Sequence, residues 1–283
     1  MSESKKRKQL LTAYGLVLPS FIVVMLVVAW PILTALKMSF THPDTGEFTL
    51  ENYKYFFTTP RELTNILFTL FVVVVTVALA TILAYMLALY LRFVKSRTSR
   101  LIGNLYLLPR FIPGMVAVYA MITVIRDSGL LNRISQLFGY DFRPGMMYHA
   151  SGMITMNLWF NVPFAALMIT AGLGAIPDSM VESARDVGAN KLRVFRSMIL
   201  PLSMKDVVIA ATFVFMSNVG SFTTPYLMGG NYPKMLGIVL FDQFNKYLRY
   251  ERAAAMSFII FLICSVSAGV YIYTNLKEKD WEK

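Results

Sequence analysis

Long runs of apolar residues are the feature of this sequence that most restricts its fold. Several of them exceed the roughly 18 residues that mark a segment able to cross a membrane as a helix. Only 15% of the 283 residues are charged, against roughly 25% in an average soluble domain, and the charges cluster between the apolar runs. We therefore expect an all-α, polytopic membrane protein.

The apolar runs predict six transmembrane helices, which we expect to form one domain over residues 1–283. Four basic residues precede the first run, as in a signal peptide, but the run is too long and no small-residue cleavage pattern follows. We expect this span to be retained, with Pro19 and Pro31 as kink points. The spans are expected at about 12–37, 63–91, 101–125, 150–174, 205–228 and 252–275.

The distribution of lysine and arginine predicts the orientation in the membrane. Six spans place both termini on one side, and that side holds 16 of the 27 Lys and Arg residues. The opposite loops hold 10, and Arg110, inside the expected third span, is the remaining one. Because cytoplasmic loops carry the excess of positive charge, both termini are expected in the cytoplasm. This bias also explains the net charge of +11 better than nucleic-acid binding does.

A polar stretch at 178–201, DSMVESARDVGANKLRVFRSMILP, lies between the fourth and fifth expected spans. Asp178 is expected to cap a first helix, Gly188 to allow a turn, and Pro201 to begin the next span. Helical spacing predicts a buried side on each helix, made of Val181, Ala184, Val187 and Ala189 on the first and of Leu192, Phe195 and Ile199 on the second. By physics alone the stretch could be an ordinary amphipathic loop or a place where a soluble partner docks.

The spacing within this stretch resembles the signature loop of the permease subunits of bacterial binding-protein-dependent ABC importers. That pattern reads Glu-Ala-Ala, three residues, Gly, nine residues, then Ile-x-Leu-Pro. This chain matches it at Glu182, Ala184, Gly188, Leu200 and Pro201, and departs from it at Ser183 and Met198. The loop also precedes the penultimate span, as in that family. The resemblance covers about 60–275 and implies a type I ABC importer permease fold, of the MetI-like kind, in the bacterial cytoplasmic (inner) membrane.

In that family the loop sits in a groove of a cytoplasmic ATP-hydrolysing subunit. The resemblance implies that Glu182 makes a charged contact there and that Gly188 forms the turn between two short helices. The residues expected in this ATPase-coupling loop are Glu182, Ser183, Ala184, Arg185, Asp186, Gly188, Leu200 and Pro201. The expected partners are two copies of the ATPase subunit, a second permease subunit that is a paralogue, an external solute-binding protein and membrane lipid, but no nucleic acid.

Catalytic and metal-binding patterns are not found in this sequence. No P-loop motif is present, so ATP and Mg²⁺ are expected in the partner ATPase subunits and no cofactor in this chain. Cys264 is a single cysteine, and His42 and His149 are far apart, so we expect no metal site and no enzyme activity. A stand-alone secondary transporter is the alternative class. Such a protein would more naturally carry carboxylates in the middle of its spans.

Polar residues inside the spans are candidates for the translocation path. Arg110 lies between Pro109 and Pro113, where an ionisable group is a functional hypothesis by default but can also satisfy backbone carbonyls. Polar side chains also hold spans together, which is their commoner role. The other path candidates are Trp159, Asn161, Ser217, Asn218 and Ser221.

Two short segments bear on the solute. Sugar-type permeases usually read Ile-Asp-Gly-Ala after the Glu-Ala-Ala element, whereas residues 185–189 here read RDVGA, which resembles polyamine, phosphonate, thiamine and ferric-iron permeases. Residues 220–230, GSFTTPYLMGG, resemble the polyamine (spermidine/putrescine) type. We therefore expect a polyamine first, an aminophosphonate second and a sugar third. Arg110 fits a cationic polyamine poorly, which keeps the aminophosphonate open.

Overall fold

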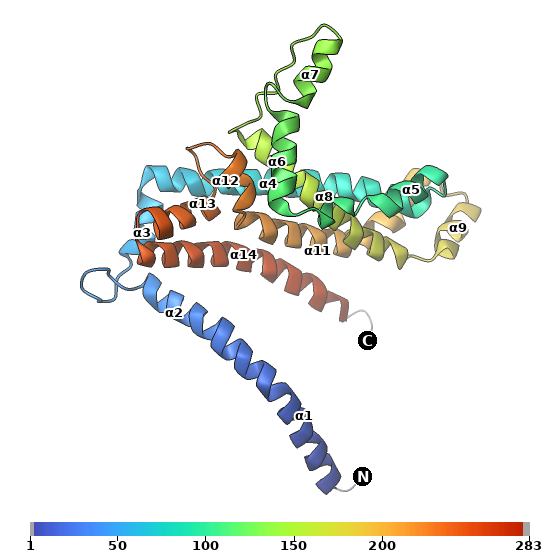
Figure 1. Cartoon of the computed structure of the whole chain (residues 1–283). Coiled ribbons are helices and arrows are strands. Elements are labelled where there is room, and N and C mark those ends of the chain that lie inside the picture. Colours follow the sequence, from blue (N-terminus) through green and yellow to red (C-terminus); the bar gives the residue numbers. More distant parts are fainter. Residues whose placement is uncertain (1–2, 280–283) are drawn as a thin grey trace. The chain divides into compact units, whose positions relative to one another are not determined.

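The computed structural model describes residues 3–279, and the regular elements in that range are helices (Figure 1). Their bounds are α1 Glu3–Val24, a π-helical turn Met25–Ala29, α2 Trp30–Ser39, α3 Glu51–Thr58, α4 Pro60–Phe93, α5 Arg97–Leu105, a 3-10 turn Leu108–Phe111, α6 Gly114–Ile125, α7 Leu130–Leu137, α8 Ala150–Gly174, α9 Asp178–Asp186, α10 Lys191–Val194, a π-helical turn Phe195–Ile199, α11 Leu200–Val219, α12 Thr223–Met228, α13 Leu236–Phe241, a π-helical turn Asp242–Lys246 and α14 Tyr250–Lys279.

The sequence predicts one membrane domain, and the structure groups the chain into two compact units. The first unit comprises the chain up to Thr59 together with Leu240–Ile259. The second comprises Pro60–Val239 together with the chain from Ile260 onward. The 178–201 loop and every path candidate belong to the second unit.

Six helical segments within residues 3–279 are long and apolar enough to cross a membrane, as the sequence predicts. They are Tyr14–Ser39, Pro60–Phe93, Gly114–Leu137, Ala150–Gly174, Lys191–Val219 and Tyr250–Thr274. The expected third span, 101–125, is not a single helix. Pro109 and Pro113 lack backbone N–H donors, and between α5 and α6 the chain forms a 3-10 turn instead.

The fifth span begins earlier and ends earlier than expected. The helix runs across Pro201, where we expected it to start, because a π-helical turn precedes the proline: the Leu200 N–H donates to Phe195 O, five residues back. Such a turn accommodates the ring and the missing donor of a proline. The same arrangement precedes Pro31, where the Trp30 N–H donates to Met25 O. After Val219 the chain turns at Gly220, and α12 is a separate short helix.

The first unit is held together where α2 ends and α3 begins. The Tyr53 and Ser39 hydroxyl oxygens are 2.6 Å apart, and the Asn52 amide donates to the carbonyl oxygens of Ser39 and Thr41 at 3.1 and 3.0 Å. The Arg252 guanidinium lies 4.0 Å from the Tyr55 ring centroid. Apolar side chains along the first span, such as Leu16 and Val27, are exposed, so in a membrane they face lipid or another subunit.

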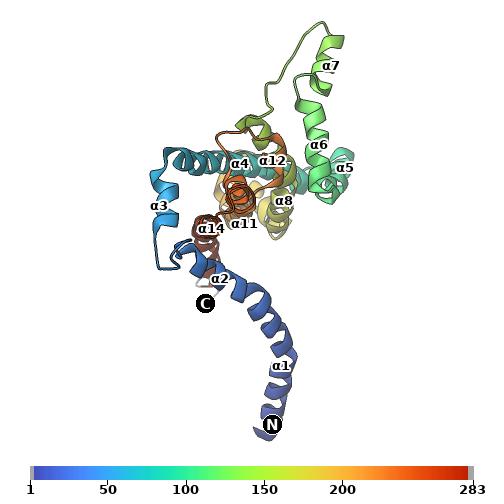
Figure 2. The same cartoon turned by 60° about the vertical axis from the view of Figure 1, so that its left-hand side comes forward.

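The core of the second unit is formed by α4, α8 and α11, which pack against one another (Figures 1 and 2). Ala80, Ala84 and Ala88 recur every four residues along one side of α4 and are fully buried. They belong to the same cluster as Ala165 and Ala166 of α8. Small side chains at these positions let the helix backbones approach closely, which is a common basis of helix packing in membranes.

Substitution of Ala84 by leucine is expected to destabilise this core. Ala84 is 0% exposed, and overpacking a close helix contact costs about 1–3 kcal/mol. We expect a lower apparent melting temperature for the detergent-purified protein. The control is Ile82→Leu on the same helix, where the side chain is 57% exposed, and it should melt like the wild type. Equal melting of Ala84→Leu and the wild type would show that the α4 contact is not tightly packed.

Candidate functional site

The 178–201 loop folds as a helix, a turn and a second helix, as its sequence predicts. Gly188 has φ +85°, a conformation that residues with a side chain rarely adopt, and it follows the end of α9. The turn is closed by two hydrogen bonds, from Gly188 N–H to Arg185 O and from Ala189 N–H to Ala184 O. The Asn190 side chain then caps α10 by accepting from the Arg193 N–H at 2.8 Å. A short helix–turn–helix element, closed by these hydrogen bonds, thus joins α8 to α11.

Asp178 does not cap α9, contrary to expectation, because Pro177 occupies the cap position. Its carboxylate instead accepts a 2.6 Å hydrogen bond from Arg92, in the last turn of α4. The same guanidinium donates to two carbonyl oxygens at the end of α8, those of Leu173 at 3.2 Å and Ile176 at 2.9 Å. We call this set, Arg92 with Leu173, Ile176 and Asp178, the Arg92 clamp. It ties α4, α8 and the start of α9 together.

The positive charge of Arg92 is balanced by the Asp178 carboxylate at the protein surface. The hydrogen bond from Arg92 and then its positive charge lower the pKa of the Asp178 carboxyl group, and Lys95 adds a smaller effect. The Lys95 ammonium is 3.8 Å from the second carboxylate oxygen of Asp178. Asp178 is therefore ionised at neutral pH, and the clamp is complete there.

One side of the loop packs into the core of the second unit. Val181, Val194 and Ile199 are buried with Leu173 and Ile176 in one apolar cluster, and Ala184, Ala189 and Phe195 pack against it. Two expectations were wrong. Val187 is 85% exposed because α9 ends before it, and Leu192 is 55% exposed because Val194 takes the buried side of α10.

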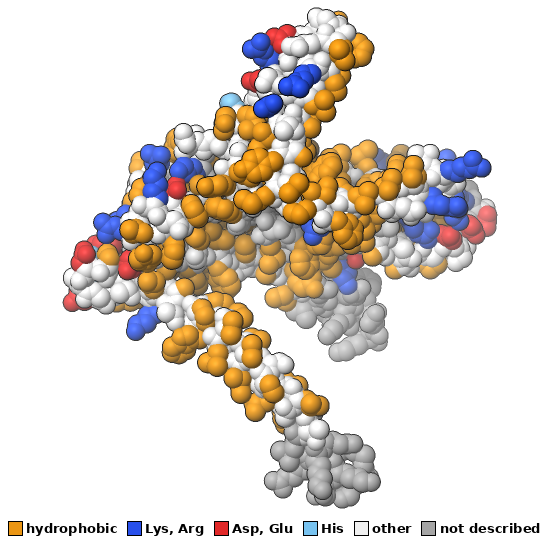
Figure 3. All heavy atoms as spheres, viewed as in Figure 1, with side chains coloured by type: hydrophobic (Ala, Val, Ile, Leu, Met, Phe, Trp, Pro, Cys, Tyr) orange, Lys and Arg blue, Asp and Glu red, His pale blue; other side chains and the backbone are white. Residues whose placement is uncertain are grey.

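The opposite side of the loop is exposed and carries the charges. Glu182, Arg185 and Asp186 lie three and four residues apart on α9 and are exposed, as is Ser183. A cavity of about 120 Å³ between α9 and the end of α4 is lined in part by Glu182, Arg185 and Arg92. In Figure 3, acidic and basic side chains gather at this end of the second unit, while apolar side chains cover much of its helices. Leu200 and Pro201 lie where the loop joins α11. This surface therefore presents both acidic and basic side chains to a soluble partner.

Three of the path candidates meet in a buried polar cluster between α8 and α11. The Asn161 amide donates to Asn218 Oδ1 at 3.4 Å and to Asn157 O at 2.7 Å. The Ser217 hydroxyl lies 3.3 Å from Asn161 Oδ1, and the Asn218 amide donates to Val214 O at 2.6 Å. Asn161 and Asn218 are buried. The bonds of Asn161 to Asn218 and to Ser217 join two spans, which is the commoner role of polar residues in membrane helices.

The remaining path candidates lie outside that cluster. Trp159 is 40% exposed and Ser221 lies in the turn after α11. Arg110 was expected within the third span but lies in the 3-10 turn between α5 and α6, where it is exposed. Its guanidinium carbon is 5.0 Å from the ring centroid of Phe164 in α8, a cation–π contact.

Two residues of the site were missed by the sequence analysis. Arg92 was counted only as a positive charge of a loop, and no local pattern indicates that it reaches the end of α8. Asn157, which is buried, accepts the Asn161 amide through its carbonyl oxygen. Its position one helical turn before Asn161 was the available signal. Within residues 3–279, no group of three or more His, Cys, Asp or Glu residues could hold a metal ion.

These features define a class of protein, a six-span helical membrane protein with an exposed helix–turn–helix between its fourth and fifth spans. Residues 80–280 match the family described as the binding-protein-dependent transport system inner membrane component. The chain belongs to that family. It is a multi-pass permease subunit of an ABC importer and not an enzyme.

Curated relatives of the chain are transport permeases. It is 24% identical over 225 residues to the spermidine/putrescine transport system permease protein PotB of Escherichia coli (strain K12), covering 79% of this chain and 82% of that protein. It is 29% identical over 160 residues to the thiamine transport system permease protein ThiP of Brucella suis biovar 1 (strain 1330), covering 56% of this chain and 29% of that protein.

Solved structures share the fold. A chain of a bacterial ABC transporter involved in the import of the acidic polysaccharide alginate has a TM-score of 0.82 at 18% identity, with 99% of both chains covered. A chain of the MetNI methionine ABC transporter in an inward-facing conformation has a TM-score of 0.54 at 18% identity, covering 75% of this chain and 95% of that chain. The importer permease fold expected from the sequence is thereby confirmed.

Proposed function

We propose that this chain forms half of the translocation path of an ATP-driven importer for a polyamine of the spermidine/putrescine type. The observation that carries the proposal is the similarity to the spermidine/putrescine permease, which extends over 79% of this chain. The segment 220–230 supports the same solute. An external binding protein delivers the solute, and a second permease subunit, a paralogue, forms the other half of the path.

The exposed side of α9 is where the partner ATPase docks in this proposal. Glu182 and Arg185 present charge there, Val187 adds an exposed apolar side chain, and the opposite side of α9 is fixed to the core. A rigid helix held at both ends can pass a movement of the ATPase on to the spans. Both termini then lie in the cytoplasm, and ATP with Mg²⁺ is bound by two ATPase subunits.

An aminophosphonate is the second candidate solute, and Arg110 is the observation that favours it. Its exposed guanidinium forms no ion pair with any residue of the described range 3–279. Such a group suits an anionic solute better than a cationic one. A sugar is the third candidate, and the alginate transporter supports it only through its fold.

Calorimetric titration of the external solute-binding protein of this importer distinguishes the three solutes. We expect binding of spermidine or putrescine and no binding of 2-aminoethylphosphonate or maltose. Binding of 2-aminoethylphosphonate alone would replace the polyamine by the second candidate. Binding of maltose alone would replace it by the third.

Replacement of Arg110 by leucine tests whether this residue lies on the path. If the solute is an aminophosphonate, we expect its uptake into proteoliposomes that hold the complete importer to fall by about tenfold, equivalent to ~1.4 kcal/mol, because the guanidinium that pairs with the phosphonate is lost, while ATPase association is unchanged. Arg110→Lys keeps a cation near Phe164 and should lose less. Wild-type uptake by Arg110→Leu would remove Arg110 from the path.

A further inference from the structure

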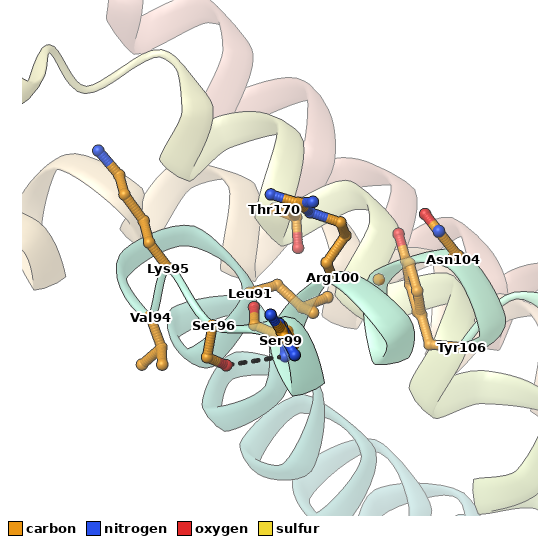
Figure 4. Close-up of a pocket in the computed structure, with 11 residues that line it drawn as sticks. Leu91, Val94, Lys95, Ser96, Ser99, Arg100, Asn104, Tyr106 and Thr170 are labelled. Carbon is orange, nitrogen blue, oxygen red and sulfur yellow. Dashed lines mark hydrogen bonds between the residues drawn. The ribbon is translucent and has the colours of Figure 1, made fainter.

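The turn between α4 and α5 forms a polar cavity that the transport function does not use. Its volume is about 660 Å³, and three basic residues, Lys95, Arg97 and Arg100, line it (Figure 4). Ser96, Ser99 and Asn104 add polar groups to the wall. No carboxylate is among the lining residues. The cavity therefore gathers positive charge without an internal counter-charge.

The basic residues of this cavity are available to a ligand. Arg97 and Arg100 form no ion pair within the described part of the chain, and Lys95 reaches only the Asp178 carboxylate, at 3.8 Å. Thr170 of α8 lines the same cavity as Arg100 (Figure 4). The Thr170 hydroxyl oxygen is buried and has no hydrogen-bond partner among residues 3–279. An anion in the cavity would be attracted by the Arg97 and Arg100 guanidinium groups, which are exposed.

The helix that follows the cavity carries exposed apolar side chains next to its basic residues. Leu101 is 58% exposed and Leu105 is 46% exposed, and both follow the basic residues along α5. Val94, in the turn itself, is 41% exposed. Basic residues beside exposed apolar side chains are the pattern of a helix that lies in the membrane interface. Because α4 is long and apolar enough to cross a membrane and ends at Phe93, we expect the turn near the membrane surface.

We propose that this cavity binds the phosphate headgroup of an anionic phospholipid such as phosphatidylglycerol. The phosphate contacts Arg97 and Arg100, and the acyl chains lie along Leu101 and Leu105. Basic pockets between membrane helices recognise anionic headgroups in this way. The proposed function places this turn on the cytoplasmic side of the membrane. The assignment of the lipid to the cytoplasmic leaflet therefore rests on that function. The binding itself does not depend on the transported solute.

Lipid retention by the purified importer complex tests this site. The complex is placed in nanodiscs of phosphatidylcholine mixed with phosphatidylglycerol, released into detergent and analysed by native mass spectrometry. We expect the Arg97→Gln/Arg100→Gln variant to retain about 25-fold less phosphatidylglycerol than the wild type, about fivefold for each removed cation. The control is Arg126→Gln/Arg133→Gln, which removes two exposed cations elsewhere and should retain lipid like the wild type.

Two outcomes would overturn the proposal. The first is equal retention of phosphatidylglycerol by the cavity variant and the control variant. The second is displacement of the lipid by millimolar inorganic phosphate, which would assign the cavity to a soluble anion. Because the readout is bound lipid, it stays informative if uptake of polyamine fails, and the melting temperatures of the variants show whether both are folded.

Discussion

Reversal of the charge at Glu182 is expected to separate ATP hydrolysis from solute uptake. The residue is exposed on the side of α9 that faces away from the core, so Glu182→Lys leaves the packing of Val181 untouched. In the proposed complex it places a cation where the ATPase groove receives an anion. Disruption of a buried charge pair at an interface costs about 2–5 kcal/mol, so association should weaken by about 30-fold or more.

Two readouts check the role of Glu182. Co-purification of the ATPase subunit should fall, and the amount of solute taken up per ATP hydrolysed should fall in proteoliposomes. Glu47→Lys makes the same charge change at an exposed position in the first unit, outside the loop, and should behave like the wild type. Full ATPase association and full uptake by Glu182→Lys would mean that the role of Glu182 has been misassigned.

Loss of the Arg92 clamp is expected to have the second-largest effect on solute uptake. The ATPase subunit should still bind, because the exposed side of α9 is unchanged. Arg92→Gln removes the donors that serve Leu173 O, Ile176 O and the Asp178 carboxylate. Hydrogen bonds from charged groups contribute about 1.5–3 kcal/mol each, and the partly exposed Asp178 bond contributes less. Without these bonds, α9 should move with the ATPase while α4 and α8 follow less. Uptake per ATP should therefore fall, and the melting temperature should fall with it.

Asp178→Asn distinguishes the contribution of the ion pair from that of the two hydrogen bonds that Arg92 donates to carbonyl oxygens. It removes the ion pair and leaves both carbonyl bonds, so its effect should be smaller than that of Arg92→Gln. Because Arg92 lowers the pKa of Asp178, the ion pair stabilises the fold above the ordinary pKa of aspartate. That contribution is lost as the pH falls through the lowered value. If Arg92→Gln takes up as much solute per ATP as the wild type and melts at the same temperature, the clamp does not pass the movement of α9 on to α4 and α8.

The number of spans and the position of the loop were readable from the sequence because their signals are local. A run of apolar residues must be long enough to cross a bilayer, and Gly188 allows a turn that other residues resist. The interruption of the third span was harder to predict. Pro109 and Pro113 were noted as sources of free carbonyls, but whether two prolines bend a helix or end it depends on the neighbouring spans.

The contacts of the site could not be read from the sequence because they join distant segments. Arg92 meets Leu173 and Asp178 only through the packing of α4 against α8. Asn161 and Asn218 were foreseen as polar candidates, and their mutual hydrogen bond depends on the register of α8 against α11. Val187 shows the limit of helical spacing, since the pattern predicts a buried side without saying where the helix ends.

The central claim is that this chain moves solute only as part of an ATP-driven importer, and vectorial uptake tests it most directly. Proteoliposomes are prepared with this permease alone, or with its partner permease, the ATPase subunits and the external binding protein. We expect labelled spermidine or putrescine to accumulate only in the complete system supplied with ATP, with no dependence on an ion gradient. Accumulation by the purified permease alone, driven by an ion gradient without ATP or binding protein, would contradict the account.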